Sequence, residues 1–229
     1  MLETVVKPEY RPTLPTLLRP LRPWQRWGIV ALLVLPLVVG AWVATGGARE
    51  AETQVVIREP IAFNLAYGPR LTRVDDQSTA LRLEQRRGDL FIQSFAVKPL
   101  TLPPYEGTPA GALPLTATEY ERELERTYDD FTLVREGRTR INQNPGYEII
   151  FRAKLEDRTL YGRHILLVPA VDEDENLVLD AQREGVIIEM AATPVSGTPN
   201  AESTGNVGAL KKPLRTFRFG TERSGGAES

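Results

Sequence analysis

The feature that most constrains this chain is a long uncharged segment near its N-terminus, "WGIVALLVLPLVVGAWVATGG", which runs from Trp27 to Gly47. A helix formed by its apolar part, Gly28 to Ala44, would be about 25 Å long at roughly 1.5 Å per residue. This length is near the minimum for crossing the hydrocarbon core of a bilayer. A buried pair of strands would need a turn signal, and the isolated Pro36 and Gly40 provide a poor one.

Aromatic and basic residues flank this segment as they flank membrane helices. Tryptophans stand at both of its ends, and indole rings prefer the headgroup region of a bilayer. The central Pro36 would break a soluble helix but is tolerated in a membrane helix. We predict a transmembrane helix over residues 28–45. The predicted membrane-interface residues are Trp24, Trp27, Trp42, Arg22 and Arg26.

Two other interpretations of the segment stay open: a cleaved signal peptide, because small residues follow in "VATGGA", and a buried helix of a soluble protein. Residues 1–27 carry five basic and two acidic side chains, whereas residues 50–229 carry 22 basic and 28 acidic ones. The positive-inside rule then places the basic, proline-rich tail in the cytoplasm and the larger domain outside it. We expect a cell-membrane location, with the lipid bilayer as one partner.

Few residues of the chain offer chemistry. It has no cysteine and one histidine, His164, which excludes cysteine nucleophiles and any site that needs two imidazoles. The phosphate-binding and serine-nucleophile motifs G-x-x-x-x-G-K-[ST], G-x-G-x-x-G and G-x-S-x-G are missing from the sequence. We interpret His164 as a structural residue on a sheet face. We expect no catalytic or cofactor-binding residue, no cofactor and no nucleic-acid partner.

The acidic stretch "DEDENLVLD" is the best metal candidate in the sequence. Asp172, Asp174, Asn176 and Asp180 match liganding positions of a calcium loop. However, Leu177 replaces the glycine of the sharp turn, and Arg183 replaces the bidentate glutamate. We therefore predict no metal site and interpret Asp172–Asn176 as a solvated acidic tip.

Period-2 alternation dominates the rest of the chain and predicts six to eight strands. They lie in "IAFNLAY", "TALRLEQRRGDLFIQSFAV", "GYEIIFRAKLED", "TLYGRHILLVPA" and "EGVIIEMAAT", with turns at Arg87–Asp89 and at Asp157–Arg158. One helix is predicted in "TATEYERELERTYDDF", capped at Thr116 or Thr118, with a core-facing stripe of Tyr120, Leu124, Tyr128 and Phe131. A shorter helix is predicted over Ala201–Lys212, ended by Pro213, and "PLRTFRFG" closes the domain.

These patterns predict an α+β domain around a twisted antiparallel sheet. The predicted boundaries are a tail at 1–27, the membrane helix at 28–45, a linker at 46–57, the domain at 58–220 and a disordered tail at 221–229. The segment Lys98–Leu115 is predicted as a long loop with an exposed Tyr105. Such loops often carry function, although a plain connection is the favoured interpretation here.

The element order, together with "NPGYEIIF" and the closing "LRTFRF", resembles the PsbP-like superfamily over roughly residues 58–220. This resemblance implies an α-β-α sandwich and a non-enzymatic role in protein binding or assembly, and it transfers no site residue. We therefore expect a membrane-anchored module that binds membrane or envelope proteins. The alternatives are a binding protein for a small ligand or lipophilic solute and, less favoured, an envelope hydrolase that uses His164 or a carboxylate pair.

Overall fold

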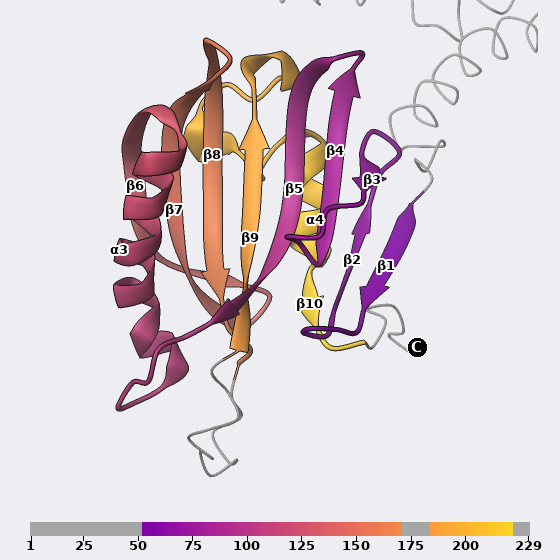
Figure 1. Cartoon of the computed structure of the whole chain (residues 1–229). Coiled ribbons are helices and arrows are strands. Elements are labelled where there is room, and N and C mark those ends of the chain that lie inside the picture. Colours follow the sequence, from indigo (N-terminus) through magenta and orange to yellow (C-terminus); the bar gives the residue numbers. More distant parts are fainter. Residues whose placement is uncertain (1–51, 171–183, 222–229) are drawn as a thin grey trace, which may run out of the picture. The chain divides into compact units, whose positions relative to one another are not determined.

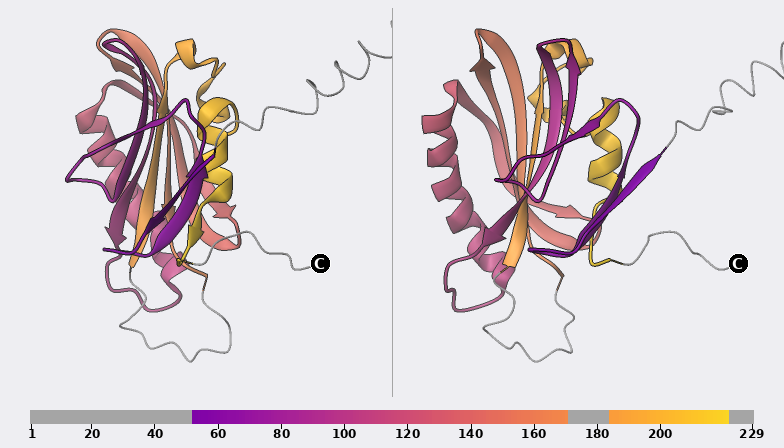
Figure 2. Two further views of the ribbon diagram at one scale, coloured as in Figure 1. Left: turned by 90° about the vertical axis from the view of Figure 1, so that its right-hand side faces the viewer. Right: turned by 45° about the vertical axis from the view of Figure 1, so that its right-hand side comes forward.

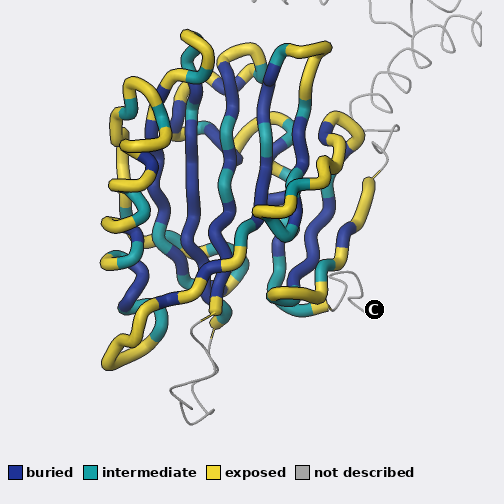
Figure 3. The backbone as a smooth tube through the Cα atoms, viewed as in Figure 1, coloured by how far each residue is buried: buried dark blue, intermediate teal, exposed yellow. Residues whose placement is uncertain are grey.

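Apolar side chains point to both faces of the central strands, and the layered fold follows from this double burial. On strand β9 (Glu184–Ala192), Ile188 belongs to one hydrophobic cluster and its neighbour Ile187 to another. Because successive side chains of a strand point to opposite faces, a single sheet must separate the two clusters. Figure 1 shows this sheet between its covering layers, and Figure 3 shows that its inner strands are buried along most of their length.

The computed structural model describes residues 52–170 and 184–221, within a unit that extends from Glu50 to Ser229. The predicted membrane helix at 28–45 and the tail that precedes it lie outside the described residues. Within the described ranges, no helix has both the length and the apolar character needed to cross a membrane.

The main sheet has seven strands in the order β3-β4-β5-β9-β8-β7-β6, and every neighbouring pair is antiparallel. Besides β9, its strands are β3 (Thr72–Val74), β4 (Leu81–Arg87), β5 (Leu90–Thr101), β6 (Asp129–Ile141), β7 (Asn144–Leu155) and β8 (Arg158–Leu167). The pairing places Ala96, Glu189 and His164 in one row across β5, β9 and β8. The predicted α+β class with an antiparallel sheet is confirmed.

Helix α3 (Pro109–Thr127) covers one face of this sheet and packs on β6, β7 and β8 (Figure 1). Leu113, Ala117 and Leu124 are buried in the same cluster as Phe151 of β7. Removing apolar surface from water stabilises this contact by about 25 cal/mol per Å². The packing of this face, rather than helix propensity alone, therefore holds α3 in place.

The predicted start of this helix is wrong, because α3 begins at Pro109 and not near Thr116. A proline at the first helical position lacks an N–H that would have no partner there anyway, so it starts a helix without penalty. Thr116 and Thr118 lie inside the helix, and their hydroxyls donate to the carbonyls of Ala112 and Pro114. Neither threonine therefore caps the helix.

The predicted core-facing stripe is divided between two elements. Leu124 is buried on α3, but the helix ends at Thr127, and Phe131 belongs to strand β6. The rings of Tyr128 and Phe131 both pack on Phe151, with centroids 5.3 and 5.1 Å away. Strand β6 itself was not predicted, because its exposed and charged sequence at the sheet edge lacks a clear apolar alternation.

A second, three-stranded sheet and helix α4 (Lys211–Thr216) cover the other face, as the two views of Figure 2 show. Its strands are β1 (Thr53–Ile57), β2 (Phe63–Tyr67) and β10 (Arg218–Phe219), in the order β1-β2-β10. The rings of Phe63 and Phe217 stack in this layer, with centroids 5.4 Å apart. The expected α-β-α sandwich is thus modified, since strands make up part of its second outer layer.

Two predicted boundaries near this layer are also corrected. Residues from Ala201 onward form the short 3₁₀ helices η2 (Ala201–Ser203) and η3 (Gly208–Leu210), after η1 (Pro194–Ser196), instead of one helix. Gly205 and Gly208 have positive φ angles, which interrupt a helix. Pro213 lies in the first turn of α4, where no N–H is required. Strand β1 lies within the segment predicted as a linker, so the ordered domain begins before residue 58.

The predicted hairpins are present, with one turn displaced. Strands β4 and β5 are joined at Gly88, as the sequence indicates. Strands β7 and β8 are joined at Glu156 and Asp157, one residue before the predicted turn. Both of these residues have positive φ angles, which suit the right-handed twist of a tight hairpin.

Candidate functional site

A polar network lies between α3 and the sheet, where the register brings His164 of β8 beside Glu189 of β9. The hydroxyl of Tyr120 on α3 lies 2.6 Å from Glu189 Oε1 and 2.9 Å from His164 Nδ1. Lys98 of β5 completes the network, with its Nζ atom 2.9 Å from the same carboxylate oxygen. Four elements therefore bring four ionisable side chains together beneath the helix.

Burial decides the protonation states of this network. His164 is 2% exposed, and desolvation lowers its pKa to about 4, although the Glu189 charge opposes the shift. Burial and then the Glu189 charge raise the pKa of the Tyr120 hydroxyl. Burial acts to raise the pKa of Glu189, but the combined effect of His164, Tyr120 and Lys98 lowers it. At neutral pH the histidine and tyrosine are neutral, and the carboxylate pairs with the lysine.

The hydrogen bonds and ring contacts of His164 separate its imidazole from solvent. The single proton of the Tyr120 hydroxyl points to Glu189, so His164 donates its Nδ1 proton to the tyrosine oxygen. The same imidazole and the Phe151 ring form a T-shaped contact, with centroids 5.1 Å apart and planes at 81°. His164 lies on a sheet face as predicted, and its neighbours separate it from solvent.

A second charged cluster follows strand β4. Arg82 and Arg86 both donate from Nε to the Glu84 carboxylate between them, over 2.6 and 2.8 Å. Arg82 also donates from Nη1 to Asp76 over 2.9 Å. Hydrogen bonds from Ser78, followed by the one from Arg82, lower the pKa of Asp76 to about 2. We call Asp76, Arg82, Glu84 and Arg86 the β4 charge ladder.

A groove of about 680 Å³ runs beside this ladder. It is lined by Thr72, Val74, Asp75, Asp76, Gln77, Arg82, Glu84 and Arg86. Both arginines in the groove already have carboxylate partners within hydrogen-bonding distance. The arginines of the groove are therefore neutralised by carboxylates of the chain itself.

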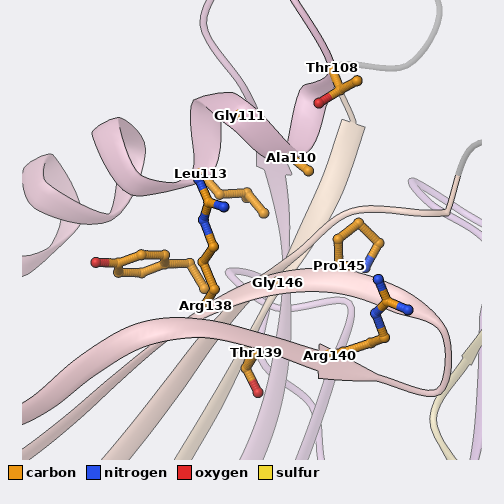
Figure 4. A pocket seen from close by; sticks show the side chains of 10 residues that line it. Thr108, Ala110, Gly111, Leu113, Arg138, Thr139, Arg140, Pro145 and Gly146 are labelled. Atoms are coloured by element: carbon orange, nitrogen blue, oxygen red, sulfur yellow. The ribbon is translucent and has the colours of Figure 1, made fainter.

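A different cavity, of about 540 Å³, opens where the beginning of α3 meets the β6–β7 hairpin (Figure 4). It is lined by Thr108, Ala110, Gly111 and Leu113 on the helix side, and by Arg138, Thr139, Arg140, Pro145, Gly146 and Tyr147 on the hairpin side. The two arginines are the only charged residues in this lining. We call the cavity the Arg138–Arg140 pocket.

Strand pairing positions the two arginines of this pocket. Arg138 is opposite Tyr147 and Arg140 is opposite Pro145, so the arginines occupy alternate positions on one face of β6. Figure 4 shows both side chains extending from β6 toward the side on which α3 lies. Neither arginine forms an ion pair with any residue in the described part of the chain. The pocket thus holds two guanidinium groups that form no ion pair with a carboxylate of residues 52–170 or 184–221.

The helix side of the pocket comes from the segment Lys98–Leu115, which was predicted as a long loop. In the structure β5 extends to Thr101 and α3 begins at Pro109, so only a short connection remains. Tyr105, which is 41% exposed, packs against Gly111, where a Cβ atom would lie 2.6 Å from Tyr105 Cε1. The absence of a side chain at Gly111 therefore lets the connection fold over the first turn of α3.

His164, which was interpreted as a structural residue, lies among the described residues. The predicted interface residues Trp24, Trp27, Trp42, Arg22 and Arg26 lie outside the described residues, as does the acidic loop Asp172–Asn176. Across residues 52–170 and 184–221, no three His, Cys, Asp or Glu side chains gather closely enough to hold a metal ion. Sequence reasoning misses Arg138 and Arg140, which in "REGRTRI" resemble an ordinary solvated strand face.

Comparisons with known proteins show the fold. No family model and no curated protein matches the sequence. LpqN of Mycobacterium tuberculosis, described as involved in cell envelope biogenesis, has a TM-score of 0.50 at 8% identity, over 76% of this chain and 93% of LpqN. This likeness shows a shared fold and nothing further.

Two other solved structures are similar at lower scores. Cyanobacterial PsbP from Synechocystis has a TM-score of 0.48 at 7% identity, over 76% of this chain and 95% of PsbP. The Ran-binding protein Mog1p from Saccharomyces cerevisiae has a TM-score of 0.43 at 10% identity, over 74% of this chain and 96% of Mog1p. Both TM-scores are below 0.5, so the fold assignment rests on LpqN.

Proposed function

We propose that this protein is a membrane-anchored binding module that acts outside the cytoplasm as an accessory or assembly subunit, and that it is not an enzyme. Residues 28–45 hold it in the membrane with the N-terminus in the cytoplasm. Anchoring raises the local concentration of the domain near membrane partners, so weak contacts suffice for association.

The contrast between the buried network and the open pocket carries this proposal. A general acid or base must lie within hydrogen-bonding reach of its substrate, whereas His164 is 2% exposed and bonded to Tyr120. The open pocket instead presents Arg138 and Arg140, which no carboxylate of the described chain neutralises. Free guanidinium groups are suited to binding carboxylates and phosphates.

The fold shared with LpqN supports a place in the cell envelope. LpqN is described as involved in cell envelope biogenesis. The basic tail before residue 28 and the acidic balance after residue 50 support the same orientation for this chain.

Photocrosslinking in native membranes tests the binding function. A photoreactive amino acid replaces Thr108 at the pocket rim, an exposed residue that makes no side-chain capping bond. Gln77, exposed beside the groove of the β4 charge ladder, is the matched control position. We expect a discrete adduct with a membrane or envelope protein from position 108 and not from position 77. The proposal fails if position 108 gives no adduct, or only the adducts seen from position 77.

Protease treatment of spheroplasts tests the orientation. We expect the domain from residue 52 onward to be digested while cytoplasmic marker proteins stay intact. If this domain survives under conditions that digest known extracytoplasmic domains, it lies in the cytoplasm and the proposed orientation is wrong.

A small-ligand binding protein is the second candidate, because the Arg138–Arg140 pocket has about 540 Å³ and ligand pockets typically have about 300–1,000 Å³. The pocket is polar and open, which favours a soluble ligand over a lipophilic one. The interface between α3 and the sheet is filled elsewhere by side chains such as Leu124 and Phe151. An envelope hydrolase would have to use a carboxylate pair, since His164 is enclosed.

A further inference from the structure

We propose that the Arg138–Arg140 pocket binds a phosphate group, carried by a small organic phosphate or by a phospholipid headgroup. This inference rests on the second candidate function, small-ligand binding in this pocket, and specifies the chemistry of that ligand. It is carried by the charge of the pocket lining, by the geometry of its walls and by the contrast with the β4 charge ladder.

The charge of the lining selects an anion. Ten residues line the pocket, and the charged ones among them are both arginines. Arg138 and Arg140 are exposed and have no ion-pair partner among the described residues. An anion that enters the pocket therefore meets two guanidinium groups without displacing a carboxylate of the protein. In the β4 charge ladder an anion would have to compete with Glu84 for both arginines.

The walls of the pocket suit a phosphate with an organic substituent. The two arginines rise from alternate positions of β6, and Thr108 stands on the opposite, helix side (Figure 4). Arginine offers a fixed fork of donors that matches the oxygens of a phosphate. Leu113, Pro145 and Tyr147 add apolar surface for the substituent. The beginning of α3, which has no acidic residue in its first turn, adds favourable electrostatic potential.

Two guanidinium groups favour a doubly charged phosphate over a singly charged carboxylate, because each can then face a formal negative charge. Burial, followed by the charges of Glu136 and Glu121, raises the pKa of Tyr147, so carboxylates stand near that tyrosine, and Glu136 is the nearest acid along β6. Its charge repels an anion at the Tyr147 end of the pocket. We therefore place the phosphate toward Arg140 and Thr108.

Calorimetric titration of the full-length protein in detergent micelles tests this inference. The soluble probes are inorganic phosphate, phenyl phosphate and, as the carboxylate match, benzoate. The lipid probes are dihexanoyl phosphatidic acid and, as its control, dihexanoyl phosphatidylcholine. The variants are Arg138→Ala, Arg140→Ala, the double variant and Arg140→Lys, with Arg86→Ala from the β4 charge ladder as the matched control. Thermal unfolding of each variant confirms that it folds.

We expect phenyl phosphate or phosphatidic acid to bind more tightly than its control. Each single alanine variant should lose roughly tenfold in affinity, which is the loss of one charge-assisted contact. The double variant should lose binding altogether, Arg140→Lys should keep most of it, and Arg86→Ala should keep all of it. Binding of phenyl phosphate alone identifies a soluble ligand, and binding of phosphatidic acid alone identifies a headgroup.

The inference is overturned if no phosphate probe binds, if benzoate binds as tightly as phenyl phosphate, or if the double variant binds as tightly as the unmodified protein. These failures are distinct from failure of the proposed function. A protein that binds no phosphate but still gives a specific adduct from position 108 keeps the binding function. A protein that binds phenyl phosphate and hydrolyses it loses that function, because it is then an enzyme.

Discussion

Strands β4 and β6 each carry three charged residues at alternate positions, but in a different order. The arginines of β4 are paired with a carboxylate, whereas those of β6 line an open pocket. In β4 the order is Arg-Glu-Arg, and the central Glu84 accepts from both neighbours. In β6 the order is Glu-Arg-Arg, so Glu136 stands at one end and lies near Tyr147. The two arginines beyond it have no ion-pair partner among the described residues. The two strands therefore differ in the position of one carboxylate rather than in the number of charges, and the proposed anion site follows from this difference.

The largest effect is expected from placing a carboxylate inside the pocket. Arg140→Glu removes one guanidinium group and lets the new carboxylate pair with Arg138, as Glu84 pairs with its neighbours in the β4 charge ladder. We expect the affinity for phenyl phosphate to fall by at least about 100-fold, or about 2.7 kcal/mol. Calorimetric titration measures the loss. Unchanged affinity would show that Arg140 does not contact the phosphate.

The reverse change removes the carboxylate from the ladder. Glu84 is 6% exposed and accepts from two arginines, so Glu84→Gln weakens both contacts. We expect the free energy of unfolding to fall by about 1–2 kcal/mol. Chemical denaturation measures this change, and Glu119→Gln on the exposed face of α3 is a control. Equal free energies of unfolding for the two variants would mean that the β4 charge ladder does not stabilise the fold. We expect Glu84→Gln to leave phosphate affinity in the Arg138–Arg140 pocket unchanged.

A smaller effect is expected from Glu136→Gln. This substitution removes the negative charge nearest to Arg138 along β6 and leaves the arginines in place. Because the side chains are exposed and water screens them, we expect phenyl phosphate affinity to rise only about two- to fivefold. The gain should shrink as salt is added. A loss of affinity would indicate that Glu136 positions Tyr147 for the ligand instead of repelling it.

The smallest effect concerns the pH dependence of the ladder. Asp76 has a pKa lowered to about 2 by hydrogen bonds from Ser78 and Arg82. A carboxyl with a lowered folded pKa contributes stability that is full above its unfolded pKa of about 3.9 and declines as pH falls toward 2. The stability difference between the unmodified protein and Asp76→Asn should therefore be constant above about pH 5 and shrink below about pH 4. A difference that stays constant to pH 2 would contradict this assignment.

Much of the fold is predictable because strands and core-facing residues leave a local pattern. The alternation in "GYEIIFRAKLED" correctly places Ile149 and Phe151 on one face of β7. The boundaries of α3 and α4 are less predictable, because Pro109 and Pro213 each occupy a first helical turn, where proline is tolerated rather than a signal to stop. Strand β6 escapes prediction because an exposed edge strand does not need an apolar face.

The sequence by itself determined the uncharged N-terminal segment, the uneven charge, the single histidine and most of the strands, because each of these is a local property of the chain. Only the tertiary structure decided the environments of the polar groups. It enclosed His164 beside Tyr120 and Glu189. It also placed the beginning of α3 opposite Arg138 and Arg140, so that together they line one pocket. Burial, pairing and pocket shape depend on residues far apart in the chain, so no local pattern records them.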